Sequence, residues 1–502
     1  MISALLLARA GVRVLIVERR PEPHGAPRAV HLDDESLRVL QAVGVAEGFT
    51  AISRPALGMR LLDRRHRVMA ELRRDGTGLH GHPRANMFDQ PDLEELLRSA
   101  VLDQPLVRVR RRCTVVGIEP DGVRVQVTLD DDGDRTTVST RAVLGCDGAG
   151  SAVRRLLGIA LRELGAADRW LVLDVRSARQ LPTWAGVQQV CDPARAVTFM
   201  QVGADRYRWE VRLADGETAA DLAAPAQLAG LLAPWQGEIT SAALQVLRAA
   251  EYTFRAQVAT RWRDGRVFLL GDAAHLTPPF VGQGLGAGVR DAANLSWKLA
   301  RVLAGTSPED LLDTYEAERA PQAVATIRLA QLVGWAMTGG GGGVAALRRA
   351  VLTTAVRVPG MARSPLATRP PALRRGPLVR RSRLTPWSRV GHPLPQPTVT
   401  VDGRAVPLDE VLGSSFALVT RAAPGPRARR LARDIDARIV QVAAAGGGRS
   451  VTDDTGVLLR WLERGRCEAV LVRPDRIVLA AGRVEGLHRA VRRLPISMSQ
   501  DR

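Results

Sequence analysis

Residues 267–299, VFLLGDAAHLTPPFVGQGLGAGVRDAANLSWKL, constrain the fold more than any other stretch of this chain. An apolar run, Val267 to Leu270, leads directly into Gly271-Asp272, and a proline pair follows at Pro278-Pro279. Three glycines then stand at alternate positions before a helical pattern begins: Gly282, Gly284 and Gly286. Glycine lets the backbone approach a ligand closely, and proline limits the entropy lost when a loop becomes ordered. The stretch therefore predicts a buried strand, a loop and a helix N-terminus that hold a ligand with hydroxyl and phosphate groups; the alternative is an ordinary strand-loop-helix connection.

A second strand pattern near the start of the chain ends in an acid. VRVLIVERR (residues 12–20) predicts a buried parallel strand with Glu18 at its tip. In a dinucleotide-binding fold, an acid at this place binds ribose hydroxyls, and the GxGxxG loop lies about 20 residues upstream. Here that position falls before Met1. We therefore expect the first strand and the phosphate loop to be absent, either because an internal methionine is taken as the start or because the chain is truncated.

Three further patterns complete the organisation. A short apolar strand at 142–144 runs into Cys146-Asp147-Gly148 and a helix, which repeats the strand-turn-helix logic of the central stretch. Residues 160–255 alternate as strands with turns and predict an antiparallel sheet, a suitable wall for a planar, apolar substrate. Residues 396–495 alternate between strand and helix signals and predict a small α/β domain.

Composition excludes several classes of function. The formal charge is +19, but Lys298 is the only lysine and the arginines are spread along the chain, so we expect no nucleic-acid partner. We find no apolar run of about 18 residues and no signal peptide, so we expect a cytoplasmic protein without a membrane span. The four cysteines are far apart and lack CxxC spacing, which predicts reduced thiols and no metal site. A homodimer is compatible with the sequence.

Taken together, these residues resemble the single-component (class A) FAD-dependent aromatic hydroxylases, the p-hydroxybenzoate hydroxylase class. They are most similar to the hydroxyphenylpropionate and polyketide hydroxylases with a C-terminal thioredoxin-like domain. The resemblance covers nearly the whole chain, and it rests on the following segments: VLIVERR (14–20), PRAVHLDDESLRVLQAVGV (27–45), CDGAGSAVRR (146–155), residues 271–300, LLDTYEAER (311–319) and VLVRPDRIVLAAG (470–482). The long GDAAH…PP…GQG…DA.NL.WKL pattern is its most specific part.

The resemblance implies an α/β fold with an N-terminally truncated Rossmann-like FAD domain. The implied units are residues 1–160 (FAD-binding, with the first strand and GxGxxG absent), 161–255 (substrate-binding sheet), 256–345 (second part of the FAD domain, with a long helix), 346–395 (helical linker) and 396–502 (thioredoxin-like, without CxxC).

The resemblance also implies the chemistry. FAD is reduced by NAD(P)H, O2 is captured as a flavin C4a-hydroperoxide, and one oxygen atom is transferred to a phenolic or polyketide aromatic substrate. Epoxidation or Baeyer–Villiger oxidation of a polyketide is an alternative on the same fold, and a non-catalytic relic without the phosphate loop is another.

Residue roles follow from the same resemblance. Glu18 would bind the adenosine ribose, Arg28 and Gln90 the ribityl-pyrophosphate portion, and Asp272 the ribityl hydroxyls. Asp147 lies in the turn shared by FAD and nicotinamide. Pro279 would lie over the flavin ring beside the substrate, and the ring would be lined by Gly282, Gly284 and Leu285.

Two residues depart from the family pattern near the expected flavin. Relatives often have glycine where this chain has His31, and several have asparagine where it has Gly286. His31 is the one nearby group that titrates near neutrality, which makes it a candidate general base; the alternative is a loop histidine.

Overall fold

The computed structural model describes residues 1–22, 28–239, 243–338, 371–374, 376–379, 385, 387–444, 451–491 and 495. The greater part of the expected helical linker, 346–395, lies outside these ranges. Among the described residues, no helix combines the length and the hydropathy that crossing a bilayer requires.

An α/β unit, which we call the N-terminal domain, holds the central stretch. Strands β11 and β20 pair in parallel with β19 beside them, while β1 and β7 form a separate parallel pair. Its helices and 3-10 turns are α1 (Ile2–Arg9), α2 (Asp34–Ala42), α3 (Ala46–Ile52), α4 (Gln90–Leu102), α5 (Ala152–Leu156), η2 (Gly271–Ala273), η3 (Pro279–Val281), α8 (Gly284–Leu303) and α9 (Asp310–Thr338). Its strands are β1 (Val14–Glu18), β2 (His31–Asp33), β3 (Ser53–Pro55), β6 (Ala85–Phe88), β7 (Val107–Arg111), β8 (Thr114–Pro120), β9 (Val125–Asp131), β10 (Asp134–Thr140), β11 (Val143–Gly145), β12 (Leu161–Glu163), β18 (Gln257–Ala259), β19 (Arg263–Asp264), β20 (Val267–Leu269) and β21 (His275–Leu276).

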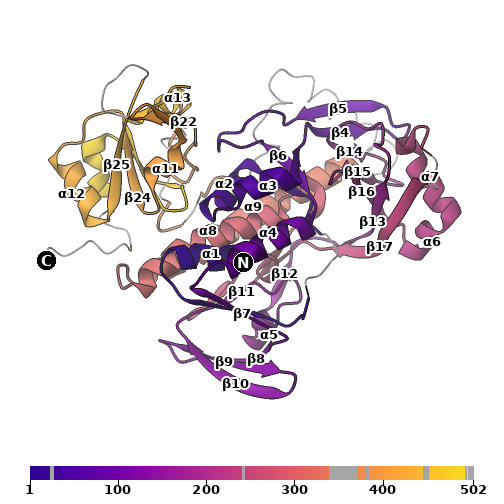
Figure 1. The fold of residues 1–502 in the computed structure, drawn as a ribbon, viewed down its shortest axis with the longest axis horizontal. Coiled ribbons are helices and arrows are strands. Elements are labelled where there is room, and N and C mark those ends of the chain that lie inside the picture. Colours follow the sequence, from indigo (N-terminus) through magenta and orange to yellow (C-terminus); the bar gives the residue numbers. More distant parts are fainter. Residues whose placement is uncertain are drawn as a thin grey trace.

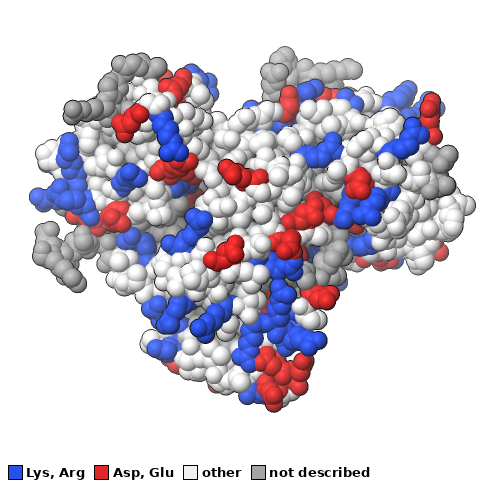
Figure 2. Space-filling model, in the orientation of Figure 1, with Lys and Arg blue, Asp and Glu red and all other residues white. Residues whose placement is uncertain are grey.

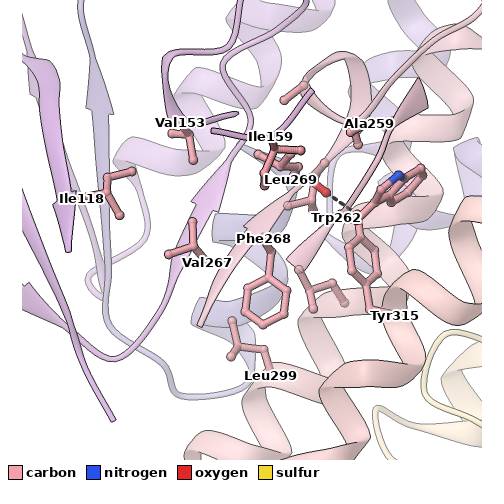
Figure 3. Close-up of a cluster of buried hydrophobic side chains, with 14 of the residues drawn as sticks. Ile118, Val153, Ile159, Ala259, Trp262, Val267, Phe268, Leu269, Leu299 and Tyr315 are labelled. Carbon is pink, nitrogen blue, oxygen red and sulfur yellow. Dashed lines mark hydrogen bonds between the residues drawn. The ribbon is translucent and has the colours of Figure 1, made fainter. Parts of the chain in front are cut away.

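The predicted buried strand of the central stretch is β20. Val267, Phe268 and Leu269 are fully buried, as expected for a parallel strand covered on both faces. Figure 3 shows the cluster around this strand, in which the Tyr315 hydroxyl of α9 donates a hydrogen bond to the carbonyl of Leu269 at 2.8 Å. Helix α9 is thereby fixed against the strand that leads into the loop.

A seven-stranded sheet with two covering helices forms what we call the sheet domain. The strand order is β17-β13-β16-β15-β14-β4-β5. Its elements are β4 (Gly58–Leu62), β5 (Val68–Arg73), β13 (Asp168–Ser177), β14 (Val187–Val190), β15 (Val197–Gln201), β16 (Arg206–Arg212), α6 (Ala219–Ala223), α7 (Pro225–Gln236) and β17 (Leu244–Phe254). The hairpin β4–β5 joins through a parallel pairing of β4 with β14, so the sheet extends beyond residues 161–255 and includes residues 58–73.

The C-terminal domain is a second seven-stranded sheet flanked by helices, at the left of Figure 1. Strands β24 and β25 are parallel and joined by α12, and β27 and β28 follow antiparallel. Its elements are β22 (Thr398–Val401), β23 (Arg404–Pro407), α11 (Leu408–Leu412), β24 (Phe416–Thr420), α12 (Pro426–Asp434), β25 (Ala437–Ala443), β26 (Val451–Thr452), α13 (Val457–Arg464), β27 (Ala469–Val472), β28 (Val478–Gly482), η5 (Val484–Gly486) and α14 (Leu487–Val491).

A buried ionic cluster joins the C-terminal domain to α8 and α9. We call its members the interdomain cluster: Asn294, Lys298, Glu318, Arg473 and Asp475. Glu318 accepts hydrogen bonds from Lys298 and from Arg473, each at 2.8 Å, and Asn294 donates to Asp475 at 3.3 Å. The Lys298, Glu318 and Arg473 side chains are fully buried. Burial alone would raise the pKa of Glu318, but Arg473 and Lys298 outweigh it and lower that pKa to about 2.

Two further contacts support the same docking. Arg38 of α2 forms two hydrogen bonds with Asp409 of α11, at 2.8 and 2.6 Å. The Trp297 ring of α8 packs edge-on against Phe416, with ring centroids 5.5 Å apart. Paired buried charges of this kind fix one relative orientation of two surfaces, because any other orientation leaves a charge without its partner.

On the outer surface, charges of both signs are mixed. Figure 2 shows acidic and basic side chains scattered among uncharged ones on the visible face, with several basic groups over the lower lobe. On this face the excess of positive charge is therefore spread over several elements.

We predict that Arg473→Ala destabilises the docked protein. Its removal deprives Glu318 and Asp475 of a buried cation, and breaking a buried pair in this way costs about 3–5 kcal/mol. Urea denaturation measures the loss. The control is Arg421→Ala, whose ion pair with Glu463 is exposed and should contribute less than about 1 kcal/mol. Equal unfolding midpoints for the two variants would contradict the importance of the cluster.

Candidate functional site

The loop after β20 makes two left-handed turns that require glycine. Gly271 has φ +57° and Gly282 has φ +61°. A Cβ atom at Gly288 of α8 would lie 3.3 Å from the Cα of Gly271, so loop and helix approach closely at a pair of glycines. This local geometry explains why the stretch is rich in glycine.

One buried carboxylate, that of Asp291 on α8, holds the beginning of the loop. It accepts hydrogen bonds from the Gly271 N–H at 3.0 Å, from His275 Nε2 at 2.8 Å and from Arg319 Nε at 2.7 Å. Burial would raise the pKa of Asp291, but Arg319 and His275 outweigh it, so the pKa is lowered. Asp291 thus remains an anion that fixes strand, loop and α9 at one point.

Arg154 connects this loop with the Cys146-Asp147-Gly148 turn. The guanidinium is buried and donates to the carbonyls of Ala273 at 2.8 Å and Ala149 at 2.7 Å. The parallel pairing of β11 with β20 places the two turns at the same end of the sheet. Asp147 is exposed and accepts a hydrogen bond from the N–H of Val153 at 3.0 Å, at the start of α5.

A third set of contacts joins the loop to β2 and α2. Arg290 donates to Asp33 at 2.5 Å, to Glu35 at 2.8 Å and to Gln283 at 3.3 Å. Asp33 also caps α2 by accepting a hydrogen bond from the N–H of Ser36. His31 Nδ1 lies 3.2 Å from the carbonyl oxygen of Gly282. The loop is therefore held on two sides before any ligand is bound.

Asp272 and the start of α8 are the polar groups of the loop that stay open. Asp272 is exposed, and its side chain accepts no hydrogen bond from a described residue. The surrounding protein nevertheless displaces water from the carboxyl group, and this loss of solvation raises the pKa of Asp272. No side chain caps α8, its first turn carries no acid, and a Cβ at Gly284 would meet nothing within 4 Å. An unpaired carboxylate beside a free helix N-terminus suits a ligand that offers hydroxyl donors and a negatively polarised group. The residues present therefore fit the ribityl chain and the ring of a flavin.

The Gln90 side chain binds the backbone of the segment that carries Arg28. Gln90 Oε1 accepts hydrogen bonds from the N–H groups of Arg28 and Ala29, at 2.8 and 2.7 Å. Arg208 of the sheet domain donates to the Arg28 carbonyl at 3.1 Å. The Arg28 side chain itself is exposed. The segment that carries Arg28 is thus clamped between α4 and β16.

The other predicted residues lie at separate places. Glu18 is exposed at the tip of β1 and accepts from the N–H of Arg20 at 2.9 Å. Pro279 begins η3, whose Phe280 ring lies 5.9 Å from that of Trp170 in the sheet domain, centroid to centroid. Leu285 packs against the apolar cluster of α1, α2 and α4.

Sequence reasoning gave no role to the residues that hold the loop in place: Arg154, His275, Arg290, Asp291 and Arg319. One signal was available in the motif itself. Arg290 and Asp291 are adjacent charges on a helix segment otherwise made of Ala287, Val289 and Ala292, and buried charges require partners.

Comparison with known proteins also indicates a flavin-binding protein. The family model described as "FAD binding domain" matches residues 1–330, and the "HcaD C-terminal domain" model matches 391–496. A probable NADH-specific resorcinol 4-hydroxylase of Rhodococcus jostii is 33% identical, covering 96% of this chain and 90% of the relative. A 3-(3-hydroxy-phenyl)propionate/3-hydroxycinnamic acid hydroxylase of Burkholderia vietnamiensis is also 33% identical, over 95% and 90%. The flavin-dependent monooxygenase PieE, solved with FAD and substrate, has a TM-score of 0.77 at 25% identity, over 98% of this chain and 96% of that one.

We predict that Gly286→Ala destabilises the protein although it favours helix. A Cβ at Gly286 would lie 2.8 Å from Arg290 Nη1 and 3.0 Å from Ser36 Oγ, and Arg290 cannot move without leaving its buried partners. Such overpacking costs about 1–3 kcal/mol. Gly284→Ala is the matched control, since its Cβ meets open space. Thermal unfolding of the flavin-free variants compares them; equal stability would show that Arg290 does not exclude a side chain at 286.

Proposed function

The chain belongs to the family of flavoproteins that share this FAD-binding domain, and from that premise we propose a flavoprotein monooxygenase that hydroxylates a phenolic or polyketide aromatic substrate with NAD(P)H and O2. The observation that carries the proposal is the unpaired Asp272 carboxylate beside the uncapped start of α8. The names of the relatives, a resorcinol hydroxylase and a hydroxyphenylpropionate hydroxylase, support an aromatic substrate.

The residues of the loop would hold the cofactor. Asp272 would accept hydrogen bonds from the ribityl hydroxyls, and the first N–H groups of α8, at Gly284 and Leu285, would bind the ring. Glu18 would bind the adenosine ribose, and the Asp147 turn and the Arg28–Gln90 clamp would bind the remaining polar portion. FAD reduced by NAD(P)H would supply the activated oxygen that is inserted into the aromatic substrate. Pro279 would help to orient the substrate and to exclude water from it.

His31 acts as a neutral hydrogen-bonding group. Burial, followed by the charge of Arg74, lowers the pKa of His31 to about 4. With its proton on Nδ1, assigned from the contact to the Gly282 carbonyl, its Nε2 is a buried acceptor without a partner among the described residues. A base this weak cannot retain the proton of a phenol, whose pKa is about 10. We therefore assign His31 to holding Gly282 and to accepting a hydrogen bond, in place of the general-base role considered from the sequence.

The remaining parts of the proposal concern partners and location. The protein takes a small aromatic molecule and O2 as its partners, acts in the cytoplasm and needs no nucleic acid. Neither a homodimer nor a monomer conflicts with this function.

Product analysis tests the reaction itself. The full chain is incubated with FAD, NAD(P)H, ¹⁸O2 and a panel of phenols and aromatic polyketides, and products are identified by mass spectrometry. Incorporation of one labelled oxygen atom into an aromatic ring is expected. Labelled epoxides or ring-expanded esters would favour the alternative oxygenations, and a colourless protein that oxidises no NAD(P)H would favour a non-catalytic relic.

We predict that Asp272→Ala abolishes flavin retention without unfolding the protein, because the exposed carboxylate contributes to the ligand and to no described intramolecular bond. The visible flavin absorbance and the unfolding midpoint of the purified variant are each compared with those of the wild-type protein. Asp264→Ala, which removes an aspartate from a surface pair with Arg261, is the control. A yellow Asp272→Ala protein would refute the assignment.

A further inference from the structure

The face of the sheet domain that looks toward the N-terminal domain is polar. Along β13 and β16, side chains alternate, and one set is covered by α6 and α7: Leu171, Leu173, Val175, Tyr207, Trp209 and Val211. The opposite set comprises three cross-strand pairs: Trp170 with Arg212, Val172 with Glu210, and Asp174 with Arg208. Strand β15 adds Thr198 beside Glu210 and Met200 beside Arg208.

The two outer rows of this face contact the proposed flavin site. In one row, Arg208 donates to the Arg28 carbonyl at 3.1 Å, and Met200 packs with Val30 and Met87. In the other row, Trp170 meets Phe280, the residue after Pro279. Adjacent pairs on one face of a sheet are roughly 7 Å apart along the strand. The middle row, with Glu210 and Val172, therefore faces the interval between the Arg28 segment and η3.

Glu210 is buried without a hydrogen-bond partner. Its residue exposure is 8%, and it accepts no hydrogen bond from any described residue. The nearest cation, Arg208 Nη1, is 4.0 Å away, while Arg208 Nε donates to Asp174 at 2.7 Å. Burial raises the pKa of Glu210. The buried indole N–H of Trp170, in the next row, also lacks a partner among the described residues. Buried polar groups are normally satisfied, so the Trp170 N–H points to an absent acceptor. The Glu210 side chain is 11% exposed, so its carboxylate is still open to a hydrogen bond from a ligand.

We infer that Glu210 is a substrate-binding residue that accepts a hydrogen bond from a hydroxyl of a neutral phenol. This assignment rests on the proposed function and adds a substrate class to it. In its ionised form, the Glu210 carboxylate accepts a hydrogen bond from a phenol hydroxyl and repels a second carboxylate placed beside it. The site therefore favours uncharged phenols over phenols that carry a carboxylate.

The test compares a neutral and an anionic phenol. Resorcinol and 3-(3-hydroxyphenyl)propionate are titrated into the holoenzyme, and dissociation constants are read from the flavin absorbance change. Wild-type protein should bind resorcinol more tightly. Glu210→Gln should weaken resorcinol binding roughly tenfold, the expected effect of replacing a charged hydrogen-bond acceptor by a neutral amide oxygen, and should leave or improve binding of the propionate. A merely structural role of Glu210 would weaken both ligands alike.

Two further variants serve as controls for the Glu210→Gln measurement. Glu251→Gln makes the same change on β17 at an exposed residue opposite Leu171, on the other face of the sheet, and should bind both phenols as wild type does. Glu210→Asp retains the charge and withdraws the carboxyl by one methylene, so it should weaken resorcinol even if Glu210→Gln does not fold.

The outcomes separate the two proposals. Wild-type holoenzyme that binds no resorcinol or prefers the propionate, or Glu210 variants that keep the wild-type ratio of the two constants, would overturn the Glu210 assignment. Failure of the wild-type chain to retain flavin at all would overturn the proposed function instead.

Discussion

The architecture of the site depends on a single buried anion, Asp291. Its carboxylate accepts from the backbone of Gly271, from His275 and from Arg319, so one side chain sets the path of the loop, the position of α9 and the orientation of a histidine. A lone carboxylate could not remain ionised in that interior, and its three donors are what make the burial tolerable. The carboxylate of Asp272, next along the loop, contrasts with it: Asp291 is bonded within the protein, whereas Asp272 is exposed and accepts no hydrogen bond from a described residue.

Helices α8 and α9 extend this rigidity to the C-terminal domain. On α9, Glu318 belongs to the interdomain cluster while the adjacent Arg319 binds Asp291. On α8, Asp291, Asn294 and Lys298 follow one another within two turns, so cluster and loop share the same two helices. The C-terminal domain, whose one described cysteine, Cys467, is buried, is thus joined to the helices that carry the loop.

Local patterns in the sequence predicted much of the fold and less of the site. The apolar run at 267–270 and the glycines after it determine local structure within a few residues, and β20 and the start of α8 agree with the prediction. Partners distant in sequence are invisible to such patterns. Nothing local indicates that Arg290 binds Asp33, that Gln90 holds the backbone of Arg28, or that the hairpin at 58–73 pairs with β14. The polar face of β13 and β16 was likewise hidden, because alternation shows that two faces differ without showing what each one meets.

The interdomain cluster has a practical consequence, because Lys298 is the only lysine in the chain and its side chain is fully buried. Amine-reactive labels and lysine-specific proteases therefore find no lysine side chain on the docked molecule. Any labelling of Lys298, or cleavage after it, records a moment at which the interdomain cluster has opened. The chain carries its own chemical reporter of that opening, at a site where none has to be engineered.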